Sequence, residues 1–182
     1  MRTLVIIAHP DLQASRINRS WAEELQAQEN VTIHSLYGIY PDGAIDVRRE
    51  QQLLDSHDRI IFQYPLYWYS TPSLLKQWFD QVLELGWAYG PGGEHLSGKE
   101  IGIAISTGGP ADSYQPGAYN LFTLHDYTKP IQALAYHVLA SYLPPFILND
   151  ARNVTDEQLA ASRKAYIEHL ATAQPVALEI VQ

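Results

Sequence analysis

Short apolar runs alternate with amphipathic stretches along this chain, and that alternation constrains the fold more than any other feature. The runs typical of buried strands are Leu4–Ala8, Val31–Leu36, Arg59–Gln63, Ile101–Ile105 and Tyr142–Leu148. Strands that alternate with helices predict an α/β fold with a doubly wound, five-stranded parallel sheet. Right-handed crossovers then place helices on both faces of the sheet. The strand order 2-1-3-4-5 fits this pattern, and in that order ligands bind beyond the carboxyl ends of strands 1 and 3.

The amphipathic stretches predict the helices. Apolar residues at every fourth position indicate a helix over Ser15–Gln28. The other predicted helices are Val47–Ser56, Ser73–Leu85, a segment with Pro130 near its start, and a last helix that begins at the capping box Thr155–Gln158. Thr71 is expected to cap the helix that follows it, with Pro72 in the first turn. Pro144 and Pro145 each remove a backbone donor, so pairing of the last strand is expected to be irregular or at an edge.

Composition limits the possible functions. The 182 residues are expected to form one domain over 1–182. A net charge of −8 argues against nucleic acid as the main partner and against an anionic membrane surface. There is no cysteine, so thiol chemistry is excluded and a redox function requires a bound cofactor. The histidines lack metal-ligand spacing, so no metal site is expected. No apolar run is long enough to insert into a membrane and no signal peptide precedes the first strand, which favours a cytoplasmic location.

Three unusual loops follow predicted strands 1, 3 and 4. They are His9–Asn18, Tyr64–Thr71 and Ser106–Tyr119. The carboxyl ends of parallel strands meet at one edge of a sheet, so these loops are expected to converge there. The sequence therefore predicts one ligand site built from all three loops.

Within the first loop, Asp11–Asn18 is predicted to bind a phosphate. The first amides of the following helix have no intrahelical acceptor, and the helix dipole adds partial positive charge there. Ser15 and Asn18 add side-chain donors, and Arg16 and Arg19 add charge. The loop has no glycine, so it is neither a Walker A loop nor a GxGxxG fingerprint. A simpler alternative is that Ser15 only caps the helix.

The second loop is rich in aromatic residues, namely Tyr64, Tyr67, Trp68 and Tyr69. An exposed aromatic cluster at the end of a strand is normally buried or functional. A flat isoalloxazine ring accounts for the cluster, with the backbone N–H groups of Leu66–Tyr69 directed at its N1, O2 and N5 edge. The alternative is that these side chains form a dimer interface or core beneath the loop.

The third loop begins with Ser106, Thr107, Gly108 and Gly109. Paired glycines let the backbone approach a ligand without a clash from Cβ, and the two hydroxyls can donate to the carbonyls of a pyrimidine ring. Tyr114 can donate a hydrogen bond to charge that develops on the ring. The alternatives are a simple strand-to-loop turn and an ordinary loop tyrosine.

Together these motifs resemble the NAD(P)H:quinone oxidoreductase family of flavodoxin-like flavoproteins. The resemblance covers roughly Arg2–Leu170 and is carried by AHP with SRIN, PLYWYSTP followed by LLKQWFD, GWAYGPGG, and STGGP with Tyr114. The segments SLYGIYPDGAIDVRREQ and YLPPF are most similar to a short bacterial branch. That branch includes KefF and KefG, the ancillary subunits of glutathione-gated potassium efflux, and general stress protein 14.

The resemblance implies a flavodoxin-like homodimer that binds FMN or FAD, takes electrons from NAD(P)H and passes them to a quinone-type acceptor. FMN is preferred, because little sequence beyond the core is available to cover an adenosine. The implied flavin-phosphate contacts are His9, Ser15, Arg16, Ile17 and Asn18. The implied ring contacts are Pro65, Leu66, Tyr67, Trp68 and Tyr69, with Ser106, Thr107, Gly108 and Gly109. Tyr114 is the implied catalytic residue, which stabilises the reduced ring during hydride transfer.

One position departs from the family pattern. The longer branch has a histidine six residues after the tyrosine, whereas this chain has Asn120, and its nearest histidine is His125. The departure argues against a tyrosine–histidine proton relay, with His125 left open as a substitute.

The sequence is compatible with three functions. The leading one is a two-electron oxidoreductase, and the absence of Asp or Glu between Asp58 and Asp80 favours easy two-electron reduction of a ring beside the aromatic loop. The second is an ancillary subunit that docks on the cytosolic face of a potassium/proton antiporter. The third is a one-electron flavodoxin.

Overall fold

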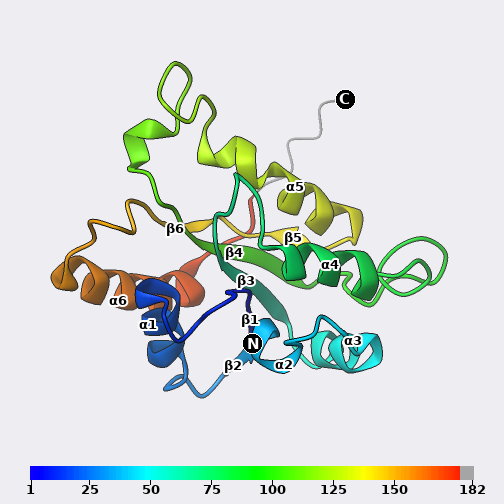
Figure 1. Ribbon diagram of the computed structural model, residues 1–182. Coiled ribbons are helices and arrows are strands. Elements are labelled where there is room, and N and C mark those ends of the chain that lie inside the picture. The colour runs from blue at the N-terminus through cyan, green and yellow to red at the C-terminus, as the bar shows by residue number, and fades with distance from the viewer. Residues whose placement is uncertain (177–182) are drawn as a thin grey trace.

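The computed structural model describes residues 1–176, and a parallel sheet forms its centre (Figure 1). The strands are β1 Thr3–Ile7, β2 Val31–Ser35, β3 Arg59–Pro65, β4 Glu100–Ser106, β5 Ser141–Tyr142 and β6 Phe146–Leu148. Their order is β2-β1-β3-β4-β5, and β6 also pairs with β4. Each of these pairs is parallel. The predicted α/β class and the 2-1-3-4-5 order are confirmed.

Helices cover both faces of the sheet, as Figure 1 shows. One face carries α1 (Arg16–Leu25) and α6 (Asp156–Thr172), and the other carries α2 (Leu36–Ile39), α3 (Val47–Asp55), α4 (Ser73–Val82) and α5 (Leu124–His137). Alternate residues of β1 supply the two cores. Leu4 and Ile6 pack on the side of α2–α5, whereas Val5 and Ile7 pack on the side of α1 and α6. None of the helices within 1–176 is long and apolar enough to cross a membrane.

The last predicted strand is split into two. Ser141 pairs with Glu100 in β5, and Phe146 pairs with Ala104 in β6, so both short strands lie against β4. Pro144 and Pro145 occupy the interval, where they donate no hydrogen bonds to the ladder. The irregular pairing expected at these prolines is confirmed, although the single strand Tyr142–Leu148 is not.

The cap residue of α4 and the start of α5 differ from the predictions. The N-cap of α4 is Pro72 rather than Thr71, and the helix begins at Ser73. Helix α5 begins well before Pro130, because Thr123 and Asp126 form a capping box ahead of Leu124. Hydrogen bonds from Lys129 and Thr123 lower the pKa of Asp126 to about 2, so this carboxylate stays ionised at neutral pH.

The carboxyl ends of the central strands meet at one edge of the sheet. Ile7 pairs with Gln63, Pro65 pairs with Ser106, and Ser106 pairs with Leu148. This register brings together the loops that follow β1, β3 and β4, as predicted, and adds the loop that follows β6.

Candidate functional site

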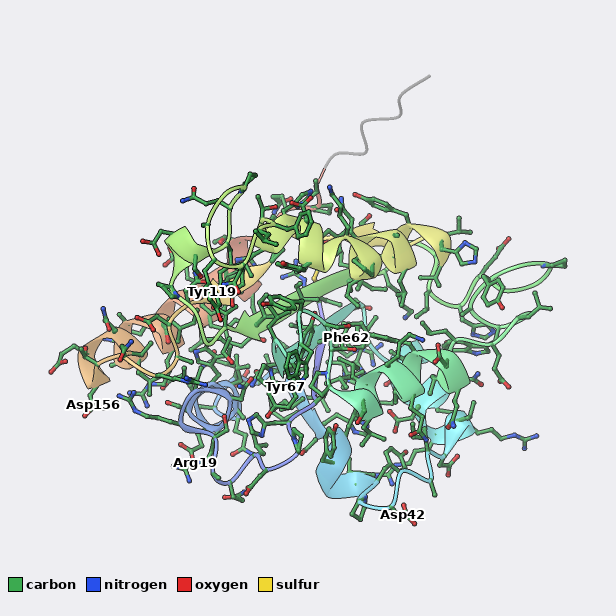
Figure 2. The ribbon with its side chains drawn as sticks, turned by 45° about the horizontal axis from the view of Figure 1, so that its top comes forward. Arg19, Asp42, Phe62, Tyr67, Tyr119 and Asp156 are labelled. Carbon is green, nitrogen blue, oxygen red and sulfur yellow. The ribbon has the colours of Figure 1, made fainter. Side chains whose placement is uncertain are left out.

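A cavity of about 370 Å³ lies at this edge. Its lining residues are His9, Ser15, Arg16, Ile17, Asn18, Pro65, Leu66, Tyr67, Ser106, Thr107, Gly108, Ala151 and Arg152. Figure 2 shows Tyr67 over the end of the sheet. The predicted convergence of three loops is therefore confirmed, and most of the predicted site residues share this cavity. Trp68 and Tyr69 do not line it.

The start of α1 presents unpaired donors to the cavity. The hydroxyl of Ser15 accepts a hydrogen bond of 3.1 Å from the amide of Asn18, so Ser15 is the helix N-cap. Ser15 therefore does cap the helix, as the simpler alternative predicted. The cap uses only the oxygen of the hydroxyl, so its hydrogen remains available to a ligand. The amides of Arg16 and Ile17 have no acceptor within residues 1–176. This end of the cavity suits an anion.

Asn18 joins α1 to the neighbouring strand ends. Its Nδ2 donates to Ser106 Oγ at 3.1 Å, and its backbone oxygen accepts from Gln63 Nε2 at 2.9 Å. All three residues are buried. Because Ser106 Oγ is the acceptor in this contact, its hydroxyl hydrogen is still available to a ligand.

Arg16 does not supply the free positive charge predicted for the cradle. Its guanidinium lies 2.6 Å from the carboxylate of Asp156 at the start of α6, and it also donates to the backbone oxygen of Val154. Arg19 is similarly engaged, because it donates to Gln13 O and lies 3.6 Å from Glu23. Arg16 is thus paired with a residue distant in sequence, whereas the partners of Arg19 are local.

His9 is a neutral donor that lines the same cavity. Burial is the largest influence on this imidazole and lowers its pKa below the ordinary value of 6.5. Nδ1 accepts a hydrogen bond of 3.1 Å from the amide of Asp11, so the proton lies on Nε2. The ring also packs edge-on against Tyr67.

The aromatic loop is a tight turn. Tyr67 and Ser70 exchange two backbone hydrogen bonds, and Trp68 and Tyr69 between them have φ values of 47° and 62°. Positive φ at both central residues is typical of a type I′ turn, which usually takes Asn and Gly, so two bulky residues here are strained. Trp68 is 93% exposed.

The predicted role of this loop's amides needs correction. Leu66 N donates to Ser106 O at 2.9 Å and Tyr67 N donates to Ser70 O at 3.0 Å, so neither amide is free for a ligand. Only the amides of Trp68 and Tyr69 lack an acceptor among the described residues of this turn. Tyr64, the fourth aromatic residue, belongs to the core.

Thr107, Gly108 and Gly109 have different environments in the third loop. The hydroxyl of Thr107 contacts Gly109 O at 2.9 Å and Asn149 Oδ1 at 3.0 Å, so it holds the loop together and is not directed at a ligand as predicted. A Cβ added at Gly108 would meet no atom within 4 Å, because that direction is open space. At Gly109 it would lie 2.8 Å from Ser113 Oγ, so a larger residue here would require the Ser113 hydroxyl to move.

A second cavity of about 440 Å³ adjoins the first. It is lined by Gly108, Gly109, Pro110, Ser113, Tyr114, Tyr119, Asn120 and Arg152, and it shares Gly108 and Arg152 with the first cavity. Tyr114 is thus placed beside the predicted ring position. His125 is exposed on α5 and lines neither cavity, which removes the support for it as a substitute.

Asn120 closes the second cavity from the side of the aromatic loop. Its Oδ1 accepts from the hydroxyl of Tyr69 at 3.2 Å, and its Nδ2 donates to Ser113 Oγ at 2.7 Å. Tyr69 also stacks on Tyr127 at 4.9 Å between ring centroids. Tyr69 therefore supports the second cavity from behind, although it lines neither cavity.

Ala151 and Arg152 are the lining residues that the sequence analysis missed. They lie in the turn between β6 and α6. The signal was available, because the loop after the last strand of a parallel sheet opens at the same edge as the others.

The donor set fits a flavin nucleotide. Two free amides, the Ser15 hydroxyl and the α1 dipole suit a phosphate at one end of the first cavity. The open space at Gly108 and the Ser106 hydroxyl suit a flat polar ring at the other end. Two larger cavities, of about 450 Å³ at the amino edge of the sheet and 540 Å³ between α4 and α5, do not combine such groups.

Comparison with known proteins gives a consistent result. Residues 1–170 match the protein family described by a flavodoxin-like fold. YdeQ, named as an NAD(P)H oxidoreductase of Bacillus subtilis, is 51% identical over 170 residues, which are 93% of this chain and 86% of that protein. KefG of an Enterobacter strain, an ancillary protein of glutathione-regulated potassium efflux, is 42% identical over 174 residues, or 96% of this chain and 95% of KefG.

Solved structures agree in fold and sequence. General stress protein 14 of Treponema denticola, in complex with FMN, superposes with a TM-score of 0.90 at 36% identity, over 94% of this chain and 98% of that one. A protein from P. pentosaceus named as an NADPH-quinone reductase superposes with a TM-score of 0.86 at 37% identity, over the same shares of the two chains.

Proposed function

This chain belongs to the flavodoxin-like fold family, and from that premise we propose that it is a flavin-dependent NAD(P)H:quinone oxidoreductase that works by two-electron transfer. The cavity in which the loops after β1, β3 and β4 converge, with two unpaired amides at the start of α1, carries the proposal. The names of YdeQ and of the P. pentosaceus reductase support the activity. We propose FMN as the cofactor, since it is the ligand of the Treponema denticola relative.

The chain's own residues bind and orient the cofactor. Bound FMN would supply two-electron chemistry, through which a hydride from NAD(P)H and a proton from solvent would convert a quinone into the hydroquinone. The α1 amides, Ser15 and Asn18 hold the phosphate, while Gly108 lets the backbone lie against the ring. The Tyr114 hydroxyl donates a hydrogen bond to the negative charge that the ring gains on reduction.

The purified protein itself tests this function. We expect flavin absorbance in the visible spectrum, FMN as the released cofactor, rapid bleaching by NADPH or NADH in anaerobic stopped-flow, and reoxidation by menadione. A protein that binds no added FMN, or a holoprotein that neither nucleotide reduces, would rule the function out.

Replacing Tyr114 with phenylalanine is expected to slow flavin reduction by about tenfold to a hundredfold, with FMN still bound. The phenyl ring keeps the edge-on packing against Tyr127 and removes only the hydroxyl. Stopped-flow reduction and FMN titration measure the two effects separately. Tyr136→Phe is the control, because it removes a hydroxyl from α5 that contacts Gln132. Unchanged reduction kinetics in the Tyr114 variant would remove the assigned role.

We propose that two copies associate through the face formed by α4 and α5. A groove of about 540 Å³ between these helices is lined by apolar side chains, including Phe79, Ile131 and Leu134. The large exposed hydrophobic residues between positions 2 and 175 are Tyr67, Trp68, Tyr69, Leu85, Tyr119, Leu121, Phe122 and Leu139, all in loops next to these two helices. An apolar groove with exposed apolar side chains in the adjoining loops favours a protein partner.

Ala133→Glu is therefore expected to convert a dimer into a monomer, because it places a carboxylate in the groove. Ala165→Glu makes the same change at an exposed position of α6 and is expected to leave the mass unchanged. Light scattering coupled to gel filtration distinguishes the two masses. A wild-type protein that is monomeric at micromolar concentration contradicts the proposed dimer.

An ancillary role at a potassium efflux antiporter is the second candidate, and the KefG relative favours it. The two functions are compatible, because an oxidoreductase can also dock on a membrane protein. Such docking would make a cytoplasmic protein peripheral to the inner membrane through its partner. An antiporter gene beside the gene for this chain would support the candidate, and potassium efflux that is unaffected by deleting this chain would count against it.

A further inference from the structure

Arg152 lies at the boundary of the two cavities. It is exposed in the turn between β6 and α6. It lines both the first cavity, which contains the start of α1, and the second cavity, which contains Tyr114. Within residues 1–176 its guanidinium has neither an ion pair nor a side-chain hydrogen bond, in contrast to the guanidinium of Arg16.

The backbone next to Arg152 is hydrogen-bonded to the loop Ser106–Gly109. Asp150 N donates to Gly109 O at 2.9 Å, and Ala151 N donates to Thr107 O at 2.9 Å. Asp150 adopts a φ of 57°, which turns the chain toward this loop. The segment that carries Arg152 is thus held against the loop Ser106–Gly109 and is placed relative to whatever that loop binds.

Other candidates for a positive charge at the site are committed or absent. Arg16 is paired with Asp156, and burial keeps His9 neutral at pH 7. Asn120 is uncharged, and His125 lines neither cavity. Arg152 therefore carries the uncommitted positive charge among the described lining residues. In a chain of net charge −8, a local cation favours a ligand that gains negative charge.

We propose that Arg152 supplies the positive charge that stabilises the flavin when it is reduced, acting in the same cavity as Tyr114. This assignment rests on the proposed function. Hydride transfer forms a bond from hydrogen to N5 of the ring, the donor leaves as NAD(P)⁺, and the displaced electron pair places negative charge on the N1–C2–O2 edge. A guanidinium beside that edge favours reduction, and charge near N1 is a recognised way for a protein to tune a flavin.

Sulfite titration of the FMN-loaded protein tests the assignment without any nucleotide donor. The lone pair of sulfite forms a bond to N5, and the displaced electron pair again charges the pyrimidine edge. We expect Arg152→Gln to raise the sulfite Kd by about tenfold and Arg152→Lys to change it much less. A tenfold loss corresponds to a two-electron midpoint potential lower by about 30 mV, measurable with reference dyes if wild type binds sulfite weakly.

Arg48→Gln is the matched control. It removes one positive charge from an exposed position on α3, away from both cavities, and is expected to leave the sulfite Kd and the potential unchanged. The effect of Arg152→Gln is also expected to shrink at high salt, because the guanidinium is exposed.

The other outcomes overturn the assignment in distinguishable ways. A large loss of FMN affinity with an unchanged potential in reconstituted Arg152→Gln would mean that Arg152 binds the phosphate instead. If sulfite affinity, potential and FMN affinity all match wild type while NADPH still reduces the protein, the assignment fails and the proposed function stands. If wild type binds no FMN, both fail together.

Discussion

Replacing Ser15 with aspartate is expected to weaken FMN binding by about thirtyfold. Aspartate caps a helix as well as serine does, so the start of α1 is retained. The added carboxylate faces the phosphate in a site where Ser15 is buried. Two unit charges about 4 Å apart repel by about 4 kcal/mol at an effective dielectric constant near 20, and screening at an open cavity reduces this to about half. Each 1.4 kcal/mol is about tenfold in Kd.

Ser15→Asn is the matched control, because asparagine has nearly the same shape as aspartate, caps equally well and carries no charge. Titration of the apoprotein with FMN, followed by flavin fluorescence, gives both affinities. Thermal unfolding without FMN checks that the two variants are equally stable. Equal FMN affinity in Ser15→Asp and Ser15→Asn would mean that the phosphate does not lie at the start of α1.

The fold and the position of the site were predictable because they depend on local patterns. Apolar runs such as Leu4–Ala8 alternate with helical periodicity, and the topology rules for parallel sheets then place the loops after strands 1, 3 and 4 at one edge. The open space at Gly108 agrees with the expectation for a glycine pair, whereas a Cβ at Gly109 would meet the Ser113 hydroxyl. Periodicity and topology are thus sufficient to locate the cavity.

The roles of individual side chains were less predictable, because they depend on partners distant in sequence. Arg16 is paired with Asp156 at the start of α6, and the amide of Leu66 donates to Ser106 O. Neither partner lies near its residue in the chain. Arg152 was missed for the same reason, since only the backbone contacts of its turn with Thr107 and Gly109 bring it to the site. Local patterns determine which loops meet, and tertiary contacts determine which donors stay free.

Glu50 shows most clearly how partners distant in sequence determine the role of a side chain. It lies in α3 directly after Arg48 and Arg49, in a polar and charged stretch of sequence, yet its side chain is fully buried. Glu50 accepts from Tyr40 at 2.6 Å and from Trp78 Nε1 at 2.8 Å. A carboxylate only accepts hydrogen bonds, so the His34 nitrogen 2.9 Å away, Nε2, carries its proton.

Replacing Glu50 with alanine is expected to lower the free energy of unfolding by about 3–5 kcal/mol. The substitution leaves three buried donors, from His34, Tyr40 and Trp78, without an acceptor and opens a cavity among them. Domains of this size are stable by only about 5–15 kcal/mol, so a large fraction of the total is lost. Urea unfolding of the apoprotein measures the change. Glu168→Ala, at an exposed position of α6, is the control and is expected to cost less than about 0.5 kcal/mol.

The pH dependence separates the charge of Glu50 from its packing. Burial by itself raises the pKa of Glu50, but the hydrogen bonds from His34, Tyr40 and Trp78 outweigh it and hold the pKa below the ordinary value of 4.5. A group whose pKa is lower in the folded state stabilises the fold above its unfolded pKa, and that contribution disappears as the pH falls through the folded pKa. Wild type should therefore lose stability below about pH 4.5 more steeply than Glu50→Gln. Parallel acid profiles of the two proteins would contradict an ionised Glu50.

Glu50→Ala also tests whether the buried hydrogen-bond cluster of Glu50, His34, Tyr40 and Trp78 acts independently of the first cavity. Glu50 and its three partners belong to the side of the sheet covered by α2–α5, whereas the start of α1 lies on the other side. Glu50→Ala should consequently bind FMN with nearly wild-type affinity at temperatures where it remains folded, although its thermal midpoint falls. FMN titration well below that midpoint measures this directly. A weakened affinity in the folded variant would mean that the sheet transmits the disturbance to its carboxyl edge, because none of the four side chains lines the cavity.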